Sequence, residues 1–145
     1  MEVGVRQRPL YLLFTVFISG MTTLAVELSA SRLLDPYFGT SNVVWANLIG
    51  LILVYLSVGY FIGGRLADRY PYPKVLYSIT GVAAVLIGVV PFIARPVLLL
   101  ASRGFATYSA GLLLGSFIGV LLLFALPVTL LGFVSPFAIR LAMRD

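Results

Sequence analysis

The chain of 145 residues contains no cysteine and no histidine. Without cysteine there are no disulfides and no thiolate metal ligands, and without histidine the commonest general base and metal ligand are missing. No glycine-rich phosphate-binding pattern follows a predicted strand, so a nucleotide site is not expected. We therefore expect no cofactor, no metal site and no catalysis by these residues.

Charged residues are also scarce: they make up 10% of the chain, against about a quarter in ordinary soluble domains. Hydrophobic residues make up 61% and gather in four long runs, in which Glu27 is the one charge. A membrane-spanning helix needs about 20 apolar residues, and lipid leaves only helices or closed barrels able to span. No run alternates as barrel strands do. The sequence predicts an all-α integral membrane protein, a bundle of about four transmembrane helices.

The basic residues lie at the ends of the apolar runs rather than in one stripe, so a nucleic-acid partner is not expected despite the net charge of +5. Loops rich in Lys and Arg stay in the cytoplasm. An N-in, C-in orientation puts seven of the ten Lys and Arg residues inside and leaves Arg32, Arg95 and Arg103 outside. We expect this orientation, in a prokaryotic inner membrane.

We predict one transmembrane domain over residues 1–145, with spans at about 10–34, 42–64, 74–94 and 109–128 and a short inner-face segment to 143. Pro36 with Gly39 is expected to end the first span, Ser41 or Asn42 to cap the second, and Pro96 to close the third. The last apolar run of 30 residues would be about 45 Å long, against a hydrocarbon core of about 30 Å. We therefore expect a kink near Pro127.

Small residues mark two candidate packing stripes. Gly111, Gly115 and Gly119 form two successive Gly-x-x-x-Gly steps, and Gly50 and Ser57 recur at a spacing of seven, continued by Gly64. Small residues let helix backbones approach closely in lipid. The stripes pack helices within the chain or join two copies through the last span. Four helices offer few internal faces, so besides the lipid bilayer we expect a homo-oligomer or other membrane subunits as partners.

Glu27 is the candidate centre of an intramembrane polar site, because a carboxylate in a membrane usually faces the bundle interior, pairs or marks a pathway. It lies about 10 Å inside the predicted outer end, and Asn47 about 8 Å inside, so the two side chains could meet. The long side chain of Arg32 could also reach Glu27. Glu27 serves either as a cation or proton site or as a structural carboxyl hydrogen-bonded to Asn47 or a nearby serine. Arg32 and Asp35 are expected to form an interfacial ion pair.

The segment that leaves the second span resembles the loop motif between helices 2 and 3 of major facilitator superfamily transporters. The resemblance rests on Gly64, Asp68 and Arg69. It implies a transporter-like loop at the inner face. From the residues alone, Asp68 is expected to cap a helix or to pair with Arg65 or Arg69.

A wider resemblance covers most of the chain. Phe17–Met21 leading to Val26-Glu27-Leu28, the segment 59–69 and Leu126–Gly132 are similar to the multi-spanning membrane region of spermidine-synthase-like proteins. In that family such a region is commonly followed by more helices and often by a soluble aminopropyltransferase-like domain, which is not expected among these residues. The resemblance makes Glu27 and Arg32 candidates for the family's charged positions on helix 1.

These observations predict a transporter-like half-bundle or a membrane subunit within a homodimer or larger complex. One alternative is a transporter half that carries a cationic, polyamine-like solute past Glu27. The other is a membrane anchor for a separate aminopropyltransferase-like enzyme.

Overall fold

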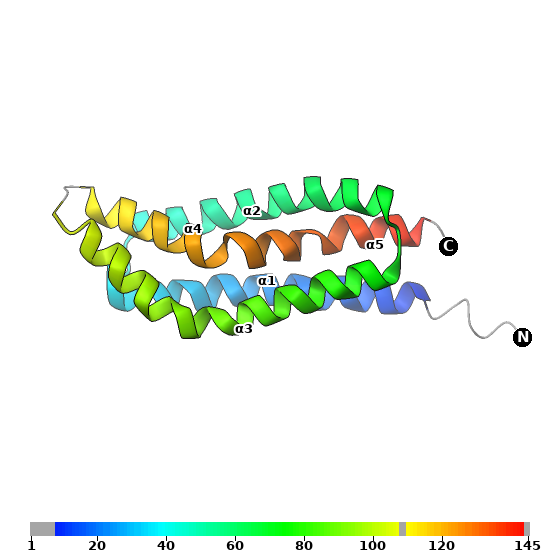
Figure 1. The fold of residues 1–145 in the computed structure, drawn as a ribbon, viewed down its shortest axis with the longest axis horizontal. Helices are drawn as coiled ribbons and strands as arrows, with labels where there is room; N and C mark the ends of the chain where they lie inside the picture. The colour runs from blue at the N-terminus through cyan, green and yellow to red at the C-terminus, as the bar shows by residue number, and fades with distance from the viewer. Residues whose placement is uncertain (1–7, 108–109, 144–145) are drawn as a thin grey trace, which may run out of the picture.

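The computed structural model describes residues 8–107 and 110–143 of the chain, and within these ranges it is helical with no strand. The elements are α1 (Arg8–Phe38), α2 (Asn42–Arg69), α3 (Pro73–Gly104), α4 (Gly111–Gly132) and α5 (Val134–Ala142). Helix α5 continues the course of α4, so the chain crosses the bundle four times (Figure 1). With α4 and α5 taken together, four helices are long and apolar enough to cross a membrane. This confirms the predicted all-α architecture of about four apolar helices.

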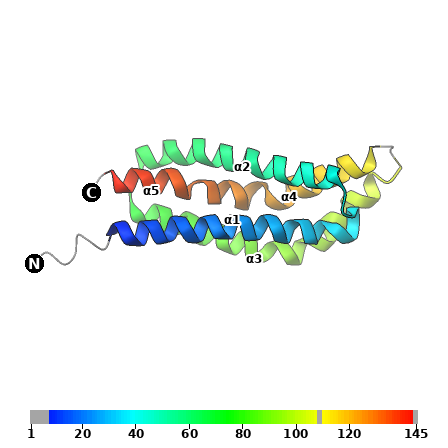
Figure 2. The same cartoon turned by 180° about the vertical axis from the view of Figure 1, so that it is seen from behind.

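Both ends of the described chain lie at one end of the bundle. The start of α1, the α2–α3 connection and the end of α5 lie there, whereas the α1–α2 connection lies at the opposite end (Figures 1 and 2). We call these the α2–α3 end and the α1–α2 end. Because consecutive helices run in opposite directions, α1 and α3 are parallel to each other.

Helices α1 and α3 run further than the sequence predicts. Pro36 lies inside α1, and Pro91 and Pro96 lie inside α3, which continues to Gly104. A proline removes one helical hydrogen bond, but leaving the helix would orphan several backbone groups, and these are expensive in an apolar environment. The prolines therefore do not stop the helices. The turn after α1 falls at Gly39, whose φ of 70° is the left-handed conformation that glycine adopts readily.

The break in the last apolar segment also differs in position. Pro127 lies inside α4, and the helix is interrupted at Phe133, between Gly132 and the start of α5. The Phe133 N–H donates to the Leu130 carbonyl at 3.1 Å, which tightens the final turn of α4. Pro127 thus stays within a continuous helix, and the interruption comes six residues later.

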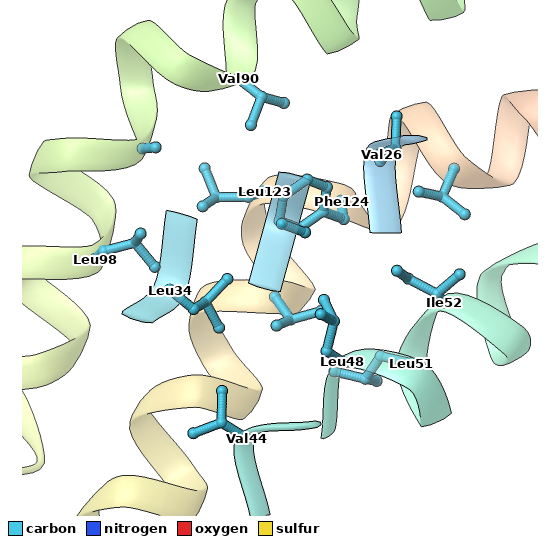
Figure 3. Packing of buried hydrophobic residues seen from close by; sticks show 14 of the residues in the cluster. Val26, Leu34, Val44, Leu48, Leu51, Ile52, Val90, Leu98, Leu123 and Phe124 are labelled. Carbon is cyan, nitrogen blue, oxygen red and sulfur yellow. The ribbon is translucent and has the colours of Figure 1, made fainter. Parts of the chain in front are cut away.

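Helix α4 is the centre of the bundle. In its apolar segment 56% of the residues are buried, against 11% in α1. The backbones of α2 and α3, although consecutive in the chain, do not come close to each other in the described residues, and each helix packs against α4. Leu123 and Phe124 of α4 lie among Val26, Ile52 and Val90 in the larger core cluster (Figure 3).

Helices α2 and α4 approach closely through glycines. A Cβ at Gly59 would lie 2.9 Å from the Cα of Gly132 and would also meet the Thr129 carbonyl oxygen, and one at Gly63 would lie 2.7 Å from the Cα of Phe133. The predicted stripe on this helix is a different one. Gly50 and Ser57 are exposed, so they do not pack within the bundle. The inward face of α2 carries the Gly59-x-x-x-Gly63 step instead.

The glycines of α4 have separate surroundings. A Cβ at Gly115 would lie 2.7 Å from the Phe38 ring and 3.2 Å from the Ala101 carbonyl oxygen, and one at Gly119 would lie 2.8 Å from the Leu98 side chain. These two glycines thus face α1 and α3 inside the chain. Gly111 instead meets the Phe105 carbonyl, just after α3, so it serves the connection between α3 and α4.

Candidate functional site

Glu27 lies at one edge of the inward face of α1, three residues before Ala30 and seven before Leu34, both of which are buried. It is half-buried, and it makes no hydrogen bond or ion pair with any residue that the structure describes. The hydroxyls one turn away are already used on their own helix. Thr23 donates to the Ser19 carbonyl at 3.0 Å, and Ser31 donates to the Leu28 carbonyl at 3.0 Å. The carboxyl is therefore left without a local donor.

Asn47 binds α4 rather than Glu27. Its side-chain amide donates to the Leu113 carbonyl at 2.9 Å and to the Ser116 Oγ at 2.8 Å. Ser116 is fully buried and donates in turn to the Leu112 carbonyl at 2.7 Å. The prediction that Asn47 meets Glu27 is wrong, because similar depth does not fix the direction in which a helix presents a side chain. Asn47 and Ser116 form a polar link between α2 and α4.

Arg32 lies near the α1–α2 end and is exposed. It lines a small hollow of about 80 Å³ together with Asp35 and Trp45. The predicted ion pair between Arg32 and Asp35 is absent among the described residues, and Arg32 does not reach Glu27. Both end groups are exposed, and holding long side chains together at an exposed site gains little free energy.

Tyr55 places a second unpartnered polar atom inside the bundle. The residue is 8% exposed, and its hydroxyl is buried without a hydrogen-bond partner among the described residues. Counted along the helices from the α1–α2 connection, Glu27 and Tyr55 lie at similar depths, about 16 Å and about 20 Å. The described residues therefore provide no hydrogen bond between helices for this hydroxyl.

The loop motif at the α2–α3 end makes a contact to α5. Asp68 Oδ1 lies 3.1 Å from Arg140 Nε, without the geometry of a hydrogen bond. The predicted partners are occupied differently: Arg65 lies over the Phe61 ring at 3.8 Å, and Arg69 over the ring of Tyr70 at 5.7 Å.

Gly64 is not required by close packing. An added Cβ at Gly64 would have its nearest neighbour in Pro136 at 3.9 Å, which is an ordinary van der Waals contact. The motif residues Gly64, Asp68 and Arg69 therefore do not converge on one site. Asp68 joins the end of α2 to α5, and Arg69 covers an aromatic ring.

No group of three acidic residues in the described ranges is placed to hold a metal ion. Comparisons with protein-family models, with curated proteins and with solved structures found no match. The resemblances to spermidine-synthase-like proteins and to major facilitator transporters therefore stay predictions from the sequence.

Proposed function

We propose that the chain is a polytopic integral membrane protein that acts as a transporter-like half-bundle or membrane subunit within a homodimer or larger complex. The observation that carries this proposal is the half-buried Glu27, which has no partner in the described chain. Ionisable groups within a span are stabilised by the interior of a bundle, by a partner or by a water-filled cavity. A second copy or additional helices packed along the Glu27 edge of α1 would supply that environment.

The sparse packing of α1 supports the same proposal. With only 11% of its apolar segment buried, most of α1 is available to another chain. Native mass spectrometry from gentle detergent and from nanodiscs measures the assembly directly. We expect an assembly heavier than one chain. A stable monomer under both conditions would contradict the proposal.

The chain itself makes the interface easy to locate, because it has no cysteine and single-cysteine variants need no further substitution. Ser31→Cys lies on the same edge of α1 as Glu27, one turn away. Val85→Cys is the matched control, 67% exposed on α3. In a homodimer we expect oxidation in native membranes to cross-link the first variant and not the second. Equal cross-linking of both would show that contacts are unspecific.

A transporter role is the second candidate, and the two unpartnered groups at similar depth, Glu27 and Tyr55, favour it. Glu27→Gln keeps hydrogen bonding and removes the charge. If Glu27 serves a cation, uptake of radiolabelled spermidine into proteoliposomes should be lost while the fold is kept. Asp35→Asn is the matched control at an exposed carboxyl of the same helix. Unchanged uptake in Glu27→Gln would leave Glu27 a structural group.

We also propose the N-in, C-in orientation, supported by the excess of basic residues expected at the α2–α3 end. Cysteines at Thr40 and Ala106, both exposed near the α1–α2 end, should react with a membrane-impermeant reagent added to intact cells. A cysteine at Tyr72, exposed at the α2–α3 end, should not. The reverse labelling pattern would show that the chain has the opposite orientation.

A further inference from the structure

An apolar groove opens on the surface between α1, α3 and α4. Its volume is about 350 Å³, within the range of small-molecule sites. Val26, Val90 and Phe124 converge at its base, where they also belong to the core cluster (Figure 3). The remaining lining is Thr22, Ala25, Ser29, Ala30, Leu33, Ile87 and Pro91. The groove therefore suits a flexible apolar chain.

The groove continues toward a cation at the α1–α2 end. A neighbouring hollow shares Ala25 and Ser29 with the groove and is lined further along by Arg32 and Trp45. Arg32 is exposed and has no hydrogen bond or ion pair within the described residues. Asp35, one turn further along α1, does not form an ion pair with Arg32. Tryptophan is enriched at the level of lipid headgroups.

A second cation stands on the α3 side of the same groove. Arg95 follows Pro91 by one helical turn, and residues four apart lie on the same face of a helix. Because α1 and α3 are parallel, Arg32 and Arg95 both lie toward the α1–α2 end, with Arg95 about 6 Å beyond Pro91. Arg95 is exposed and has no partner in the described part of the chain.

We propose that this groove, with Arg32 and Arg95, binds an anionic phospholipid, its acyl chain in the groove and its phosphate between the two guanidinium groups. A guanidinium donates two parallel hydrogen bonds to phosphate oxygens. Two unpaired arginines at one groove favour a net anionic headgroup over a zwitterionic one, whose own cation they would repel. The groove lies on the α3 side of α1, but the hollow that carries Arg32 is also lined by Ser31 on the Glu27 edge. The proposal rests on the membrane location that the proposed function assigns to the chain.

Binding is measured on the delipidated full chain by native mass spectrometry. The probes are phosphatidylglycerol and phosphatidylcholine with identical acyl chains. We expect phosphatidylglycerol to bind at least tenfold more tightly. Arg32→Gln and Arg95→Gln should each lower its affinity about tenfold, the scale of a charged hydrogen bond. The matched control Arg103→Gln, an exposed cation at the same end of α3, should bind like the wild type.

Blocking the groove tests the acyl-chain half of the proposal. Ala25 is exposed and lines both hollows, so Ala25→Leu should fill the groove, keep the fold and weaken both lipids alike. Circular dichroism melting checks the fold of each variant. Equal binding of the two lipids by the wild type, or an equal loss in Arg103→Gln, would overturn the proposal. Oleate or inorganic phosphate binding as tightly as phosphatidylglycerol would overturn the assignment to a phospholipid.

Discussion

Replacing Gly59 by alanine tests the close approach of α2 and α4. The new methyl group would lie 2.9 Å from the Cα of Gly132 and would meet the Thr129 carbonyl oxygen. Both neighbours are backbone atoms of α4, which cannot rotate away as a side chain can. Carbon atoms prefer separations of about 3.5–4.0 Å, so the two helices must part by up to about 1 Å.

The expected loss of stability follows from two opposing effects. Overpacking a well-packed contact typically costs about 1–3 kcal/mol, and alanine regains up to about 1 kcal/mol over glycine as a helix former. We expect Gly59→Ala to lower the free energy of unfolding by about 1–2 kcal/mol. The matched control is Gly50→Ala on the same helix, where nothing lies within 4 Å of the added methyl group.

The assay is reversible unfolding in mild detergent micelles, followed by circular dichroism for the wild type and both variants. Gly50→Ala should stay within about 0.5 kcal/mol of the wild type or exceed it, as exposed substitutions usually do. If Gly59→Ala were as stable as Gly50→Ala, the close contact between α2 and α4 would not exist in the molecule, and our account of their packing would fail.

Three further experiments test other contacts. Gly115→Leu should destabilise the bundle by more than about 1 kcal/mol, because its side chain meets the Phe38 ring; an unchanged melting temperature would place this face outside the core. A double-mutant cycle of Asn47→Ala and Ser116→Ala should give a coupling of about 0.6 kcal/mol, the usual size for hydrogen bonds between membrane helices, and no coupling would refute their link. Asp68→Asn should cost less than about 1 kcal/mol and less still in high salt, since the Asp68 and Arg140 side chains are 66% and 43% exposed; a larger loss, measured by the same unfolding assay, would require a buried pair.

The number and type of the long helices could be predicted from the sequence, because lipid solvation requires long apolar runs to be helical. Of the two predicted N-caps of α2, Ser41 is the one observed: its Oγ accepts from the Val44 N–H at 3.3 Å. The helix ends were harder to predict. In soluble proteins, prolines such as Pro36 and Pro96 often mark the ends of helices. Here the helices continue through them, since an apolar environment penalises several unpaired backbone groups more than one missing backbone hydrogen bond.

The packing faces could not be predicted from one helix at a time. Small residues lie on two faces of α2. Both Gly50 with Ser57 and Gly59 with Gly63 have spacings that place two small residues on one face of a helix. What decides between the faces is the partner: Gly132 of α4 offers a complementary surface to only one of them. The signal available in the sequence was the Gly59-x-x-x-Gly63 step itself, read together with a glycine late in the last apolar run.

The polar residues show the same limit. Depth along a helix placed Glu27 and Asn47 at one level, but the rotation of α2 about its axis turns Asn47 toward Ser116. Likewise, the partner of Asp68 lies on α5, distant in sequence, where spacing rules for one helix do not apply. Sequence reasoning identified Glu27 as unusual and could not say what surrounds it.

The central position of α4 has a consequence for how the protein is made. Chains emerge from the N-terminus, so α2 and α3 are made before the helix that holds them together is synthesised. Since the backbones of these two helices do not come close to each other in the described structure, the glycine face of α2 has no partner during that interval. Assembly of the core must wait for α4, and a chain truncated before Gly111 would present quality-control proteases with three loosely associated helices.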